Sequence, residues 1–214
     1  MTKQEKPILL YVFDPLCGWC YGFSPVMVRL HDEYKDMMEF DVISGGMVVG
    51  DRIGPLSDKA SYIKGAYKVV EDKMNVKFGD KYINEVLAEG SAIQTSIPSS
   101  KLLVAFKSLD NSNAILFAHE LQNALYYHGI HPDDMAGLLD NCNTFGVSKE
   151  SIMTIATSEE VIAVMEHDFE MSSQLGVTGF PTVFIIKDNA ISVVSRGADS
   201  YENVKTNMDS IISQ

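Results

Sequence analysis

The first apolar run of the chain, Lys6 to Phe13, predicts a strand, and its lack of regular alternation indicates burial on both faces. Asp14-Pro15-Leu16 follows as a turn. Cys17 to about Met38 is predicted as a helix, in which Pro25 predicts a kink or a restart. A second strand is predicted at Phe40 to Ser44, before a glycine-rich loop. This order gives a β-α-β unit.

The middle of the chain, from about Leu56 to Gln174, has helical periodicity and almost no strand pattern. Two serine-led segments, Ser148 to Ser151 and Ser158 to Glu160, have the composition of helix starts, with acidic residues in the first turn. Turn residues separate the predicted helices, which are Ser57–Asn75, Asp80–Glu89, Ser99–Leu109, Ser112–His128, Pro132–Asn143, Lys149–Ile155 and Glu159–Leu175.

Strand patterns return near the end of the chain. Val183 to Ile186 and Ile191 to Ser195 are predicted strands, Asp188-Asn189 is a two-residue hairpin turn, and Ser200 to Ile212 is a closing helix. The order predicts an α/β fold in which a large helical insertion separates a β-α-β part from a C-terminal β-β-α part. We therefore expect one sheet-containing domain from residues 1–55 and 170–214, and an inserted helical domain from residues 56–169. Two sequential domains would leave Cys17 in a half-unit without a completed sheet.

Composition narrows the functional classes. The 214 residues are 46% hydrophobic, which is ample for a core, and three cysteines do not suit a disulfide-stapled secreted scaffold. A formal net charge of -12 argues against nucleic acid as a partner. The apolar run after the polar N-terminus is too short for a signal-peptide core, and no run approaches the roughly 18 residues of a membrane span. We expect a cytoplasmic protein without a membrane partner.

The candidate chemistry lies in Cys17-Gly18-Trp19-Cys20, at the predicted start of a helix. The helix N-terminus carries unpaired N–H groups and a partial positive charge, which favour a thiolate, the nucleophile of thiol–disulfide exchange. Zinc requires about four ligands. Neither Cys142 nor the five histidines supply a second cluster at a suitable spacing, so no metal is expected. Cys17 is the candidate nucleophile, and Cys20, one turn further and more buried, is the candidate resolving thiol.

Two segments of the chain resemble the DsbA-like branch of the thioredoxin superfamily, and within it the cytoplasmic FrnE-like proteins described as predicted protein-disulfide isomerases. Asp14 to Tyr21 fits an Asp-x-x-Cys-x-Trp-Cys-Tyr pattern, and Gly176 to Thr182 fits the loop that holds a cis-proline beside the active cysteines. The resemblance implies a thioredoxin-like fold and a cis peptide bond before Pro181. Residue composition alone favours a trans bond, since cis is only about 5–6% of X–Pro bonds.

Several neighbours of the cysteines have two interpretations. A cis Pro181 would expose the backbone of Phe180 for pairing with a substrate peptide. Trp19 either offers an apolar platform to substrate or packs on the protein itself. Asp14 either caps the turn, which we favour, or raises a thiol pKa and relays a proton to Cys20. Gly18-Trp19 replaces the Pro-His pair of the strongly oxidising periplasmic DsbA, so the direction of electron flow stays open.

The predicted function is a thiol–disulfide oxidoreductase of the reductase or isomerase type. It would need no cofactor beyond its own redox-active disulfide, with glutathione as a candidate reductant and protein or small-molecule thiols and disulfides as partners. One alternative is a glutathione-dependent enzyme similar to kappa-class glutathione transferases and 2-hydroxychromene-2-carboxylate isomerases, which characteristically have serine where Cys17 stands. The other is a non-catalytic peptide-binding module. Cys142 is expected to be a small buried hydrophobe.

Overall fold

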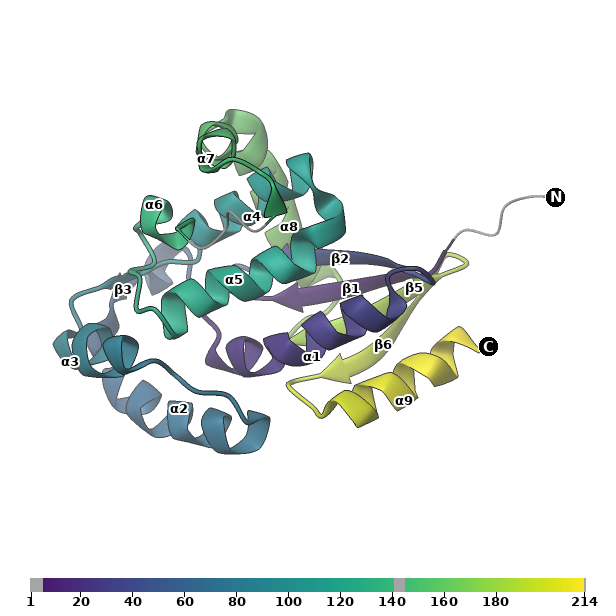
Figure 1. The fold of residues 1–214 in the computed structure, drawn as a ribbon, viewed down its shortest axis with the longest axis horizontal. Coiled ribbons are helices and arrows are strands. Elements are labelled where there is room, and N and C mark those ends of the chain that lie inside the picture. Colours follow the sequence, from purple (N-terminus) through teal and green to yellow (C-terminus); the bar gives the residue numbers. More distant parts are fainter. Residues whose placement is uncertain (1–5, 141–144, 214) are drawn as a thin grey trace.

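Segments from the two ends of the chain form one sheet. The computed structural model describes residues 6–140 and 145–213. Its main sheet has the order β2-β1-β5-β6, and β1 pairs parallel to β2 and antiparallel to β5, which pairs antiparallel to β6 (Figure 1). The strands are β1 (Ile8–Phe13), β2 (Glu39–Ser44), β5 (Thr182–Lys187) and β6 (Ala190–Arg196). The predicted α/β, thioredoxin-like fold is therefore confirmed.

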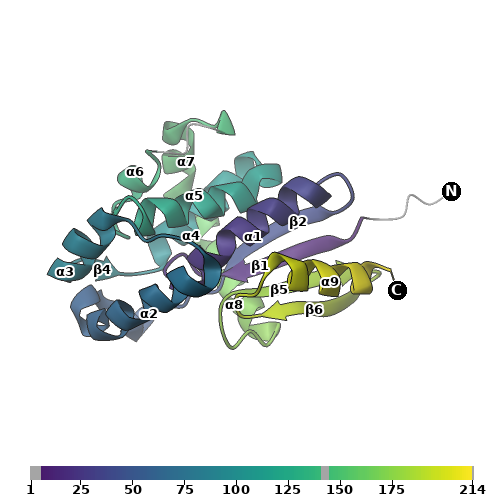
Figure 2. The ribbon, with the colours of Figure 1, turned by 60° about the horizontal axis from the view of Figure 1, so that its bottom comes forward.

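Helices cover both faces of this sheet. Alternate side chains of β1 point to opposite faces, so that Leu9 and Tyr11 join the main core while Leu10 and Val12 belong to a smaller cluster. α1 (Gly18–Tyr34) and α9 (Tyr201–Ile212) lie side by side over the first face (Figures 1 and 2). α8 (Glu159–Gln174) supplies Met171 to the smaller cluster on the second face.

The central segment is mostly helical, as predicted, but it also contains a short strand pair. β3 (Gly54–Pro55) pairs antiparallel with β4 (Ile93–Gln94), and two-residue strands are too short to leave a periodic pattern. The predicted helix Pro132–Asn143 is wrong in its extent, because the described part contains only one turn. The remaining helices are α2 (Ala60–Met74), a π-helix (Tyr82–Val86) continued by α3 (Leu87–Glu89), α4 (Ile97–Leu109), α5 (Ala114–Tyr126), α6 (Met135–Leu138) and α7 (Lys149–Ala156).

Helix α1 continues through Pro25, so the predicted restart does not occur. Proline has no N–H to donate to the carbonyl of Tyr21, four residues earlier, but the Ser24 hydroxyl donates to that oxygen at 2.9 Å. The predicted end at Met38 is wrong: α1 ends at Tyr34, because the chain must turn before Glu39 opens β2.

Local signals at element ends agree with the structure. Asp188 and Asn189 have φ values of 51° and 64°, the left-handed conformation that a two-residue hairpin turn requires. The hydroxyls of Ser148 and Ser158 accept hydrogen bonds from the amides of Ser151 and Val161, as expected of N-caps. These predicted features are confirmed.

The helical segment packs closely on the sheet unit. α5 packs against α1, and α8, which crosses the predicted boundary between residues 169 and 170, packs against β2. The division into residues 1–55 with 170–214 and residues 56–169 stays a prediction. In the described part of the chain, no helix has both the length and the apolar character needed to cross a membrane.

Candidate active site

Cys17 lies where β1 ends and α1 begins. The turn from Asp14 to Cys17 is closed by a hydrogen bond from the Cys17 amide to the Asp14 carbonyl at 3.0 Å. Cys17 is the N-cap residue of α1, and its sulfur accepts a hydrogen bond from the amide of Cys20 at 3.4 Å. A thiolate at this position would strengthen that bond, because charged acceptors form stronger hydrogen bonds than neutral ones. Both thiols are free.

Cys20 lies one helical turn further and is completely buried, whereas Cys17 is 7% exposed. Burial raises the pKa of the Cys20 thiol well above its ordinary value, and the adjacent Cys17 and the charge of Asp14 raise it further. The backbone amide of Asp14 opposes this effect by hydrogen bonding. The resting Cys20 is therefore a protonated thiol, and Cys17 is the sulfur that a substrate can reach.

The loop before β5 completes the surroundings of Cys17. The Phe180–Pro181 peptide bond is cis. The Cys17 thiol donates to the carbonyl oxygen of Phe180 at 3.6 Å across 163 positions of sequence. Gly45 allows the Phe180 ring to lie close, because a Cβ at this glycine would come within 2.1 Å of the Phe180 ring. The structure thus brings the two sequence motifs together.

Asp14 is fully buried and accepts several hydrogen bonds. Its carboxylate accepts from the amides of Leu16 at 2.9 Å and Met47 at 2.7 Å, and from the hydroxyl of Ser96 at 2.9 Å. Burial raises the pKa of Asp14 to about 6, although these bonds and the positive charge of Arg52 act in the opposite direction. Asp14 therefore caps the turn through Leu16 and also carries a negative charge near Cys20 at neutral pH.

Gln122 is a buried contact of the cysteine turn that the sequence did not single out. It lies on α5, and in the orientation that satisfies both ends of its amide, the nitrogen donates to the Cys20 carbonyl at 3.2 Å and the oxygen accepts from the Tyr21 amide at 3.1 Å. The only signal in the sequence is a polar residue within an apolar helix. Gln122 ties the central helical segment to the first turn of α1.

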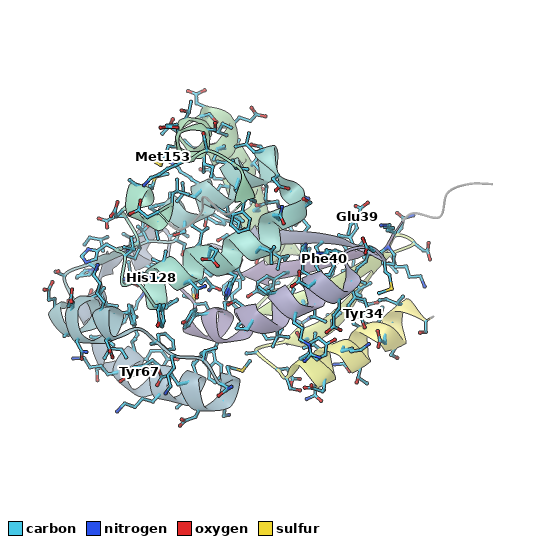
Figure 3. The ribbon with its side chains drawn as sticks, viewed as in Figure 1. Tyr34, Glu39, Phe40, Tyr67, His128 and Met153 are labelled. Atoms are coloured by element: carbon cyan, nitrogen blue, oxygen red, sulfur yellow. The ribbon has the colours of Figure 1, made fainter. Side chains whose placement is uncertain are left out.

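Cys17 opens on a cavity of about 550 Å³ between the start of α1 and α2. This volume lies within the usual range of small-molecule sites. Figures 1 and 3 show α2, which carries Tyr67, beyond the end of β1 where α1 starts. The cavity wall is largely aromatic and aliphatic, with residues that include Trp19, Ile63, Tyr67, Phe78, Tyr126 and Phe180.

Two cations, Arg52 and Lys59, line this cavity, and no carboxylate does among the residues that the structure describes. The Arg52 guanidinium is held by a hydrogen bond to the Gly46 carbonyl at 2.9 Å. This local excess of positive charge contrasts with the net charge of -12 of the whole chain. The cavity thus suits an apolar ligand that also carries a negative charge.

Trp19 and Gly18 also line the cavity. Trp19 is half-buried, packs against the main core, and also lines a second hollow with Met74 and Ala198. Packing on the protein and a free face toward a ligand therefore coexist at this side chain. A Cβ at Gly18 would lie 3.7 Å from the Phe78 ring, an ordinary van der Waals contact.

The described residues contain no group of side chains that could bind a metal ion. Across residues 6–140 and 145–213, no group of three or more His, Cys, Asp or Glu side chains is placed to hold a metal ion. His119, one of the scattered histidines, instead bonds to Ser24 at 2.7 Å and to Asn123 at 3.0 Å between α1 and α5. Cys142 lies outside the described residues.

Comparison with known proteins agrees with this geometry. A family model for the DsbA-like thioredoxin domain matches residues 8–209. The chain therefore belongs to the DsbA-like thioredoxin family, as the resemblance in its sequence indicated.

Individual relatives are distant in sequence. The ClpXP adapter protein SpxH of Halalkalibacterium halodurans is 22% identical over 189 residues, covering 87% of this chain but 61% of the relative, so the chain spans about three fifths of that protein's length. A proposed protein disulfide isomerase from Nitrosomonas europaea has a TM-score of 0.87, 22% identity, and coverage of 98% of this chain and 99% of that chain.

The cytosolic disulfide reductase DsbM from Pseudomonas aeruginosa has a TM-score of 0.80, 22% identity, and coverage of 96% of this chain and 98% of that chain, and it has also been solved with GSH. A 2-hydroxychromene-2-carboxylate isomerase is a weaker match, with a TM-score of 0.63, 15% identity and 96% coverage of each chain. At these identities the likeness establishes the fold.

Proposed function

We propose that the chain is a cytoplasmic thiol–disulfide oxidoreductase that works as a reductase or isomerase through Cys17 and Cys20. The observation that carries this proposal is the asymmetry of the pair: Cys17 caps α1 at the edge of a cavity, while Cys20 is completely buried one turn away. This is the arrangement that a nucleophilic and a resolving thiol require. The likeness to a cytosolic disulfide reductase supports the compartment and the reaction class.

The proposed reaction has two exchange steps. The Cys17 thiolate attacks one sulfur of a substrate disulfide, which forms a Cys17–substrate disulfide and releases the other half as a thiolate. Cys20 then loses its proton to the Asp14 carboxylate, and its thiolate attacks the Cys17 sulfur. The Cys17–Cys20 disulfide forms and the second substrate thiolate leaves. Two electrons have passed from the dithiol to the substrate, whose sulfurs take up two protons.

The test compares two variants in a Cys142→Ser background, which removes the third thiol. We expect Cys17→Ser to abolish reduction of insulin disulfides and Cys20→Ser to accumulate a mixed disulfide that mass spectrometry detects. Insulin reduction at the normal rate by Cys17→Ser would overturn the proposal. Peptide binding that does not depend on the redox state of the pair, without turnover, would instead support the non-catalytic module.

We further propose that glutathione returns the electrons. Two glutathione molecules would reduce the Cys17–Cys20 disulfide and leave as glutathione disulfide. The cavity beside Cys17 supports this, because Arg52 and Lys59 suit the carboxylates of glutathione, and the related DsbM has been solved with GSH. We expect Lys59→Gln to raise the glutathione concentration that gives the half-maximal rate severalfold. Lys64→Gln, an exposed residue of α2 outside the cavity, is the matched control.

Equal glutathione dependence in the Lys59 and Lys64 variants would remove the support for this reductant. The glutathione transferase alternative predicts a different result. Conjugation of glutathione to a small electrophile that saturates and persists in Cys20→Ala would favour it. The intact Cys17/Cys20 pair favours the oxidoreductase instead, since conjugation needs no second thiol.

A further inference from the structure

Tyr11 places a hydroxyl group in the core beneath the active cysteines. It lies on β1, is 1% exposed, and packs its ring against Phe13 and Phe23 with centroids 5.3 and 6.1 Å away. Among the described residues no group bonds to the hydroxyl oxygen within normal hydrogen-bond limits, and Cys20 is the side chain with which it has a weaker hydrogen-bonding interaction. A buried hydroxyl without a full hydrogen bond is unfavourable in a folded protein, so its presence here calls for a physical reason.

Cys20 lies close to this side chain: the Tyr11 ring packs against Phe23, and Cys20 stands three residues before Phe23, on the same face of α1 and in the same buried core. Burial raises the pKa of Tyr11 well above its ordinary value, and interactions with Cys20 and then Cys17 raise it further. The phenol therefore keeps its proton at neutral pH and can only donate to a negatively charged neighbour. In the resting protein Cys20 is a protonated thiol, and a neutral thiol is a weak acceptor. A Cys20 thiolate would be a strong one.

We propose that Tyr11 donates a hydrogen bond to the Cys20 sulfur while that sulfur is a thiolate, and so assists resolution of the mixed disulfide. Neither the resting Cys20 thiol nor the finished disulfide offers this hydroxyl a charged acceptor at the Cys20 sulfur. The bond would thus exist only in the species that attacks Cys17, and an interaction made only at that stage accelerates the step. The inference rests on the proposed function, because it concerns the second exchange step.

Other groups around Cys20 do not supply this donor. The Asp14 carboxylate acts against a thiolate until it takes the Cys20 proton, and both of its oxygens already accept hydrogen bonds from Leu16, Met47 and Ser96. Tyr126, on α5, interacts through charge with Cys17, Asp14 and Cys20, in that order, and lines the cavity on the Cys17 side. Gln122 engages the backbone of the turn and leaves the Cys20 sulfur untouched.

The experiment uses the reduced protein in a Cys142→Ser background and follows its reaction with 5,5′-dithiobis(2-nitrobenzoate) by stopped-flow absorbance. Attack by Cys17 releases the first coloured thiolate, and resolution by Cys20 releases the second. We expect Tyr11→Phe to leave the first phase unchanged and to slow the second about tenfold or more, the factor that one hydrogen bond to a charged acceptor provides. The pH at which the second phase reaches half its maximal rate should rise by about one unit.

Tyr34→Phe is the matched control. Tyr34 lies at the opposite end of α1 from the cysteines (Figure 3), where its hydroxyl donates a hydrogen bond to Asp209 of α9. Both phases of this variant should be unchanged. Reduced Tyr11→Phe should melt at the wild-type temperature or above, since it loses only a hydroxyl without a full hydrogen bond. A lower melting temperature with both phases slowed would indicate a structural role and overturn the inference.

Two further results separate this inference from the proposed function. If wild-type protein releases both coloured thiolates and Tyr11→Phe does so at the same second-phase rate and pH dependence, the inference about Tyr11 fails while the proposed function stands. If wild-type protein shows no second phase, resolution by Cys20 fails, and the proposed function fails with it.

Discussion

Asp14 should make the stability of the protein fall as the pH rises from about 4 to about 7. Burial raises its pKa in the folded protein from an ordinary 3.8 to about 6, so the folded state holds this proton more tightly than the unfolded chain does. The contribution of Asp14 to stability is therefore complete below pH 3.8 and is lost as the pH rises through about 6. The interval is roughly 2 pH units, which at about 1.4 kcal/mol per unit corresponds to ~3 kcal/mol.

The assay compares wild type with Asp14→Asn by urea denaturation of the reduced proteins between pH 4 and pH 8. The other carboxyl groups titrate in both proteins, including Asp168, whose pKa burial also raises to about 6. They therefore cancel in the difference between the two free energies of unfolding. The free energy of unfolding of the wild type minus that of Asp14→Asn should fall by ~3 kcal/mol between pH 4 and about pH 7.

The absolute stability of Asp14→Asn at one pH is a poorer measure. The asparagine keeps one oxygen for the donors of Leu16 and Ser96, but presents an NH₂ group to the Met47 amide, and this loss offsets the gain from removing the buried charge. The pH dependence isolates the charge. A difference that is flat or that rises with pH would refute the claim that desolvation dominates at Asp14.

Two further substitutions test how the site is held. Gly45→Ala should cost ~1–3 kcal/mol of unfolding free energy and slow the attack by Cys17, because the new methyl group collides with the Phe180 ring. Gly65→Ala, at an open position on α2, should instead gain up to ~1 kcal/mol. Equal stability of the two variants would contradict this prediction. Gln122→Leu should lower the free energy of unfolding by ~1–3 kcal/mol, because it leaves buried backbone groups of Cys20 and Tyr21 with one partner fewer. An unchanged urea midpoint would argue against that contact.

Much of the fold followed from local pattern. Neighbouring residues encode three features that appear where expected: the apolar run of β1, the hairpin turn at Asp188 and Asn189, and the N-caps Ser148 and Ser158. The prediction was incomplete where an element was too short to show a pattern, or where a neighbouring side chain compensated for a helix-breaking residue. The strand pair of Gly54–Pro55 and Ile93–Gln94 is too short to show a period, and α1 continues through Pro25 because a neighbouring serine replaces the missing donor.

The candidate site divides in the same way. Sequence alone places two thiols one turn apart at the start of a helix after a buried strand, because this arrangement depends on adjacent residues. Three contacts come from the tertiary structure alone: the Phe180 carbonyl meets Cys17, Met47 and Ser96 hold the Asp14 carboxylate, and the buried Tyr11 ring packs on the face of α1 that carries Cys20. These contacts join segments distant in sequence, and packing and burial set them, which no local periodicity encodes.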